Sequence, residues 1–278
     1  MNQPLTTGIL AMMALIAVIV WVAEIWRVHD SATGGNATRL ARISVAVLVG
    51  ALAAMLIYRG LWVHGHWLLL QSHLDGLLLV AMLLAGAIVL SQTQARLFGF
   101  AAFGLPLLVL VLVWSVCASA WTYRPFASAG WSPVWQLLHL MGVYIGTACA
   151  AIAAVAGGMY LFVQRRLKRK VGPDSRLASL ETLEGVIIRT AAAGFVLLSL
   201  GAASGVFLLP EGPIDEVPRW QSPKLLLAVV AWVMYALIIN VRRATRLRGV
   251  RAAWLAIGGF FLLLTIYGFA TAQEAGIN

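Results

Sequence analysis

Long apolar runs alternate with short polar segments along the whole chain. Each run approaches the ~20 residues that an α-helix needs to cross a bilayer. The pattern predicts spans at 8–26, 43–58, 68–90, 97–117, 136–162, 186–209, 224–239 and 252–272. We therefore predict an all-α fold: a polytopic integral membrane protein of about eight transmembrane helices, with 1–278 forming a single transmembrane domain.

The composition agrees with this class of protein. The chain is 62% hydrophobic and only 11% charged, with a mean hydropathy of +0.91. A soluble domain carries about 25% charged residues. The net charge of +10 is therefore expected on basic loops at the cytoplasmic face rather than on a nucleic-acid surface. The lipid bilayer is the predicted partner, and nucleic acid is not.

The distribution of positive charge predicts the orientation. With the N-terminus outside, four of the 20 Lys and Arg residues fall on outer segments: Arg59, Arg124, Arg219 and Lys224. All the others fall on inner segments, as the excess of Lys and Arg in cytoplasmic loops requires. We therefore expect both termini outside, which in a bacterium means the periplasm, and a multi-pass protein of the bacterial inner (plasma) membrane.

The densest group of positive charges lies in a basic cytoplasmic loop predicted at 164–185. Apolar residues recur every three positions near its end, at Leu177, Leu180, Leu183 and Val186. This spacing predicts a short interfacial helix that lies on the membrane surface.

The stretch 131–158 contains the most informative chemistry. Ser132 followed by Pro133 is typical of a helix start, because Ser caps the first turn and Pro is tolerated at the first helical position. His139 follows six residues later, about 9 Å down the helix axis. An imidazole at that depth is a titratable metal ligand just inside the membrane. Trp131 and Trp135 stand at the entrance, as aromatic rings do at a membrane interface.

Small residues recur below His139 near helical spacing, at Gly142, Gly146, Ala153 and Gly157. A face of this kind either lets another helix approach closely or leaves room for a flat cofactor. The residues alone leave both alternatives open.

A second histidine has a similar local sequence. His73 is followed by Leu-Asp-Gly and His139 by Leu-Met-Gly, so each has a glycine one turn further on. We expect His73 about five residues into its span, at nearly the depth of His139. Two facing imidazoles could bind haem iron axially, with Gly76 and Gly142 lining the floor of one cavity. Alternatively, both are hydrogen-bonded packing histidines. Asp75 points away from His73, and it either lines a polar cavity or snorkels.

Several stretches, in order, resemble the cytochrome c assembly membrane protein family, which includes CcsA, HemX and the YpjD-type inner membrane proteins. These stretches are SHLDGLLLVAML from residue 72, LLHLMGVYIGTACA from 137, LETLEGVIIRTAAAGFVLLSLGAASGVF from 180, WQSPKLLLAVVAWVMYALIINVRR from 220 and RGVRAAWLAIGGFFLLLTIYG from 248. The resemblance covers about 66–270.

The departures from the family pattern concern its haem-handling residues. A W-x-W-D segment of the family is reduced to Trp220 with Arg, Gln and Ser around it. Leu225 stands where the family has glutamate, and Asn240 where it has histidine. Only His139 carries over directly from the family's histidines. This pattern is closest to the YpjD-type branch.

The resemblance implies haem binding or delivery for cytochrome c maturation at the periplasmic face, with other cytochrome c maturation proteins as partners. We predict haem contacts at His139, His73, Trp131, Trp135 and Trp220, with His139 and His73 on the iron. Of the two histidines, His139 follows from the resemblance, and His73 follows from its similar local sequence. A non-catalytic membrane partner or regulator that has lost haem handling is the alternative. A transporter is another alternative, although the sequence lacks the paired broken spans that are typical of transporters. Whether the chain is an enzyme stays open, and a self-sufficient enzyme is not favoured.

Overall fold

The computed structural model describes residues 3–29, 35–63, 70–119, 133–169, 177–206, 223–240 and 249–274. These residues form helices and contain no strand, which confirms the all-α prediction. The elements are α1 (Gln3–His29), α2 (Gly35–Tyr58), the π-helical turn η1 (Arg59–Val63), α3 (His73–Thr93), the 3-10 turn η2 (Ala95–Leu97), α4 (Phe100–Ala118), α5 (Pro133–Lys168), α6 (Leu180–Val206), α7 (Pro223–Ile239) and α8 (Val250–Glu274).

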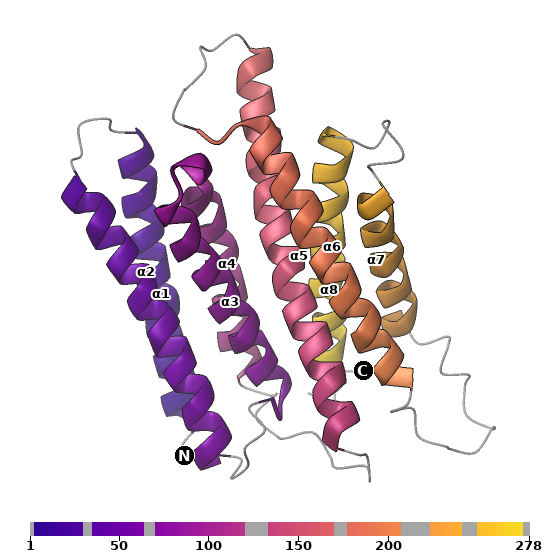
Figure 1. Cartoon of the computed structure of the whole chain (residues 1–278). Coiled ribbons are helices and arrows are strands. Elements are labelled where there is room, and N and C mark those ends of the chain that lie inside the picture. Colours follow the sequence, from indigo (N-terminus) through magenta and orange to yellow (C-terminus); the bar gives the residue numbers. More distant parts are fainter. Residues whose placement is uncertain are drawn as a thin grey trace.

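Seven of the described helices are long and apolar enough to cross a membrane, and the remaining predicted span, 224–239, corresponds to the shorter apolar helix α7. At 1.5 Å per residue, the 17 residues of α7 extend about 25 Å. The 36 residues of α5 extend about 54 Å, well beyond a hydrocarbon core of about 30 Å. Helix α1 begins and α8 ends at the same end of the bundle (Figure 1), as an even number of crossings requires.

Proline marks several helix positions. Helix α5 begins at Pro133, as the Ser132-Pro133 signal predicts, and α7 begins at Pro223, which also follows a serine in the sequence. Pro106 lies inside α4, where a lone proline is tolerated in a membrane helix.

Three predicted boundaries were wrong. Arg59–Val63 continues α2 as a π-helical turn instead of starting a loop. The apolar repeat near residue 180 belongs to the start of α6 and not to a separate interfacial helix, because Leu183 is fully buried and Leu177 and Leu180 pack on the core. Helix α5 also runs into the predicted basic loop as far as Lys168.

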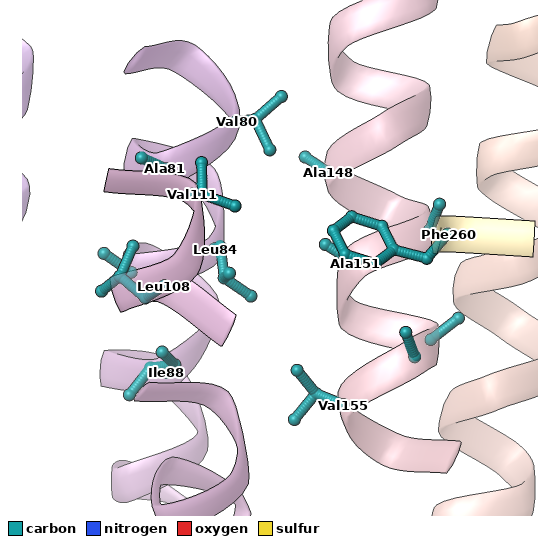
Figure 2. Close-up of a cluster of buried hydrophobic side chains, with 14 of the residues drawn as sticks. Val80, Ala81, Leu84, Ile88, Leu108, Val111, Ala148, Ala151, Val155 and Phe260 are labelled. Carbon is teal, nitrogen blue, oxygen red and sulfur yellow. The ribbon is translucent and has the colours of Figure 1, made fainter. Parts of the chain in front are cut away.

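The bundle has two groups of helices, α1–α4 and α5–α8, and the second is built around α5 (Figure 1). Helix α5 lies along α6 and also contacts α8, while α3 and α4 contact it from the first group. Figure 2 shows this junction: Leu84 and Ile88 of α3 and Leu108 of α4 face Val155 of α5. All four side chains are buried in the apolar core. The junction between the groups is therefore apolar at this depth.

Small residues let α5 approach its neighbours closely. A Cβ added to Gly142 would lie 2.8 Å from the backbone nitrogen of Gly201 on α6, and one on Gly157 would lie 2.9 Å from the carbonyl oxygen of Ala253 on α8. Of the two alternatives for the small-residue face, the structure therefore shows close helix packing at these positions.

Candidate functional site

His139 lies in the second turn of α5, half-buried against α6. Its Nδ1 is 2.6 Å from the carbonyl oxygen of Gly201, which also accepts a hydrogen bond from Ser204 Oγ at 3.0 Å. A carbonyl can only accept, so Nδ1 carries the proton. In a neutral imidazole the lone pair is then on Nε2, which is the nitrogen able to bind a metal.

Glycines make room for this imidazole. A Cβ added to Gly205 would lie 2.9 Å from both Nδ1 and Cε1 of His139, and Gly142 lies against Gly201. Any larger residue at 205 would force the ring to shift. The sequence pattern singled out the glycine at 142, but the partners at 201 and 205 emerge only from the packing of α6.

We predicted His73 about five residues into its span, but it is the first residue of α3. The helix begins there because Ser72 is its N-cap: the Ser72 hydroxyl accepts from the backbone N–H of Asp75, and the Asp75 carboxylate accepts from the backbone N–H of Ser72. This reciprocal pair is a capping box. The S-x-x-D spacing is visible in the sequence, so this signal could have placed the start of the helix correctly.

The imidazole of His73 contacts Tyr144 of α5, with 3.0 Å between His73 Nδ1 and the tyrosine hydroxyl. The Tyr144 ring fills the space beside Gly76, where an added Cβ would lie 1.9 Å from Tyr144 Cζ. Gly76 therefore packs against an aromatic ring of α5, and Gly142 packs against the backbone of α6. The prediction that both glycines line the floor of one cavity was wrong.

The two histidines contact different sides of α5. Tyr144, the partner of His73, is five positions after His139, which places the two side chains about 140° apart around the helix. His139 of α5 is hydrogen-bonded to Gly201 of α6. His73 of α3 is hydrogen-bonded to Tyr144, on the side of α5 that meets α3. The two imidazoles are therefore hydrogen-bonded to different partners on different sides of α5.

Tyr144, the partner of His73, also contacts Tyr267 of α8, so a chain of contacts leads from α3 through α5 to α8. Tyr144 stacks on Tyr267 with 5.4 Å between ring centroids, and the Tyr267 hydroxyl lies 3.2 Å from Thr147 Oγ1. This connection between α3, α5 and α8 was missed at the level of sequence. Tyr and Thr within apolar runs look like ordinary membrane residues until their partners are known.

Asp75 neither lines a cavity nor snorkels. Its carboxylate accepts from Arg59 Nε at 2.5 Å and from Ser72 Oγ at 2.8 Å, and both Arg59 and Asp75 are fully buried. The ion pair joins η1 to the first turn of α3. Arg59, which counted as an outer loop charge in the sequence analysis, is therefore an interior residue.

The predicted tryptophans are mostly outside the described residues. Trp135 lies one turn before His139 and is 41% exposed. Trp131 and Trp220 lie outside the part of the chain that the structure describes.

The fit to haem rests on His139. Within the described ranges, no group of three or more His, Cys, Asp or Glu side chains could hold a metal ion, whereas haem iron needs only axial ligands from the protein. His139 fits such a role, because one ring nitrogen is anchored and the other is left for a metal. The structure gives the imidazoles of His73 and His139 different hydrogen-bond partners, and the assignment of both to one iron stays a prediction.

The fold and these residues define a multi-pass, all-α membrane protein with a histidine anchored at one end of its longest helix. Residues 70–274 match the model of the family described as cytochrome C assembly protein, and the chain belongs to this family. The matched residues overlap almost entirely with the stretch 66–270 that carries the resemblance in the sequence.

Three relatives illustrate the similarity, each named "Cytochrome c biogenesis protein CcsA". The one from Synechococcus sp. (strain RCC307) is 32% identical over 93 residues, 33% of this chain and 29% of the relative. The one from Prochlorococcus marinus (strain NATL1A) is 34% identical over 89 residues, covering 31% and 27%. A third, from Prochlorococcus marinus (strain MIT 9515), is 25% identical over 156 residues, covering 48% and 49%.

The chain thus spans less than half the length of these curated relatives. No solved structure matches it significantly. The closer likeness to the YpjD-type branch stays a prediction.

Proposed function

We propose that this protein takes part in cytochrome c maturation at the outer face of a bacterial inner membrane, where it binds or delivers haem through His139. Membership of the cytochrome c assembly family and the names of the relatives support the pathway. The hydrogen bond from His139 Nδ1 to Gly201 supports the residue, and it is the observation that carries the proposal.

The chain's own residues would act by holding the ligand in place. The Gly201 carbonyl fixes the tautomer of His139 and the direction of its ring, as partners of metal-bound histidines usually do. Haem, when bound, would supply the iron that Nε2 ligates, and the whole haem group would be passed on to a cytochrome c. Trp135, exposed one turn away, and the predicted contacts Trp131 and Trp220 would cover the porphyrin. The other maturation proteins would be the partners for transfer.

His73 has a different place in this proposal. Because its imidazole contacts Tyr144 and not the side of α5 that holds His139, His73 would act separately from the His139 site, through Tyr144. The proposal therefore assigns the iron to His139 first.

An absorption spectrum tests the proposal. The full chain, purified from membranes with added haem, should show a Soret band that shifts between the oxidised and reduced states. His139→Ala should lose most of this band. His29→Ala, at the end of α1, is a histidine control and should keep it. Wild-type protein without a Soret band, purified from cells that are able to make haem, would contradict the proposal.

The second candidate is a membrane partner or regulator that keeps the fold without handling haem. The replacement of most of the family's W-x-W-D segment around Trp220 favours it. A deletion strain separates the two functions. Loss of c-type cytochromes together with a haem-free purified protein would support the regulator, whereas normal cytochrome levels would contradict a role in maturation altogether.

A further inference from the structure

The ends of α2 and α3 that lie away from the histidine site are joined by an arginine. Arg42, in the second turn of α2, donates from Nη2 to the carbonyl oxygen of Gln92 at 2.7 Å. Gln92 is in the last turn of α3, so this contact satisfies a terminal carbonyl and places a positive charge at the negative end of the helix dipole. By the charge distribution, this end of the bundle faces the cytoplasm.

The side chains of Arg42 and Gln92 also carry polar atoms that form no hydrogen bond with any described residue. Arg42 Nε, Gln92 Nε2 and Gln92 Oε1 are buried and have no hydrogen-bond partner among the described residues. Buried polar atoms are nearly always paired, and each exception needs an explanation. The contact of Arg42 with the Gln92 carbonyl shows that these atoms belong to one locus, which offers two kinds of donor and one acceptor.

The locus is also rich in positive charge. Arg39 lies one turn before Arg42 on α2, and Arg96 lies four residues after Gln92; both are exposed. Glu24 pairs with Arg27 and Asp75 with Arg59, and no carboxylate among the described residues forms an ion pair with Arg39, Arg42 or Arg96. An anionic ligand is therefore favoured over a neutral or cationic one.

Apolar surface adjoins this charge. Ile43 and Val47 lie one turn apart on α2 and are 49% and 65% exposed. In a bilayer such a surface contacts acyl chains, so a ligand with a charged head and apolar chains matches both parts of the locus.

We propose that Arg42 and Gln92 form a binding site for the head group of an anionic glycerophospholipid of the phosphatidylglycerol class. The phosphodiester oxygens accept from Arg42 Nε and Gln92 Nε2, and a hydroxyl of the terminal glycerol donates to Gln92 Oε1. Arg39 and Arg96 add long-range attraction for the phosphate. The site is independent of the haem proposal, since it lies at the opposite end of the bundle from His139 and His73.

Native mass spectrometry of the full chain in detergent tests the site, with phosphatidylglycerol titrated against phosphatidylethanolamine of the same acyl chains. Wild type should bind the first lipid several-fold more strongly. Gln92→Leu, which keeps the backbone carbonyl that Arg42 contacts, should lose most of this preference. Arg42→Gln should lose it as well. Arg165→Gln, which removes one exposed charge at the end of α5, is the matched control and should bind like wild type.

The melting temperature of each variant is measured in parallel, so that loss of binding by a folded Gln92→Leu is decisive even if Arg42→Gln is unstable. Equal binding of the two lipids, or wild-type binding by folded Gln92→Leu, would overturn the proposal. Displacement of the lipid by inorganic phosphate alone would assign the site to a soluble anion and would overturn it too. Unchanged lipid binding in phosphate, with loss in Gln92→Leu, is the expected result.

Discussion

Arg59 and Asp75 form an ion pair, 2.5 Å between Nε and Oδ1, in which both side chains are fully buried. The pair fastens the π-helical turn after α2 to the first turn of α3, the turn that carries His73. Ser72 takes part as well, since its hydroxyl lies 3.2 Å from Arg59 Nη2 and 2.8 Å from the Asp75 carboxylate. An interior charge pair therefore positions one of the two candidate histidines.

Removal of one partner of this pair should be strongly destabilising. Asp75→Ala leaves the Arg59 guanidinium buried without its counter-charge, which costs about 3–5 kcal/mol. We expect a clear fall in the melting temperature of the detergent-purified protein. Glu181→Gln, an exposed acid in the first turn of α6, is the matched control. The double variant Arg59→Met/Asp75→Leu should recover part of the loss, because it buries no charge. An unchanged melting temperature for Asp75→Ala would show that the pair is not buried as described.

Gly76 should not tolerate a side chain. In Gly76→Ala the new Cβ would lie 1.9 Å from Tyr144 Cζ, so the ring must move and its hydrogen bond to His73 must break. Overpacking of this kind costs about 1–3 kcal/mol. Gly86→Ala, on the same helix with nothing within 4 Å of the added Cβ, should be neutral or stabilising by up to ~1 kcal/mol. Thermal unfolding of the two variants side by side checks this, and equal melting temperatures would contradict the packing of Tyr144 on α3.

The glycine beside His139 offers a test of the haem proposal that leaves the histidine in place. Gly205→Ala puts a Cβ 2.9 Å from His139 Nδ1, so the ring loses its orientation towards Gly201. We expect a weaker or shifted Soret band at unchanged protein yield. Gly185→Ala, also on α6 and with open space around the added Cβ, should leave the spectrum unchanged. If both variants bind haem like wild type while His139→Ala does not, the ligand stands but the proposed role of the α6 contact fails.

The orientation is open to a direct test by reporter fusions. Fusions after residues 170 and 246 should report the cytoplasm, and fusions after residues 126 and 215 should report the periplasm, because most Lys and Arg residues lie on the first pair of segments. A periplasmic signal at 170 would reverse the arrangement. The same result would also move the phosphatidylglycerol site to the outer leaflet.

Sequence alone determined the class of the protein, the approximate spans and the family. Runs of apolar residues must be helical in a bilayer, since every backbone group needs an internal partner there. Local signals at Pro133 and Pro223 were sufficient to start α5 and α7. Both kinds of information are contained in neighbouring residues of the chain, and so they can be read without knowing which helices meet.

Only the tertiary structure decided which residues share a site. His73 and His139 have nearly the same local sequence, yet one contacts Tyr144 and the other Gly201. Arg59 and Asp75 are 16 positions apart and pair because η1 carries the arginine back to the start of α3. A membrane helix can bury any of its faces against a neighbour, so hydrophobic periodicity does not indicate the partner of each face. That choice depends on the close approach of helices at glycines such as Gly76, Gly142 and Gly205.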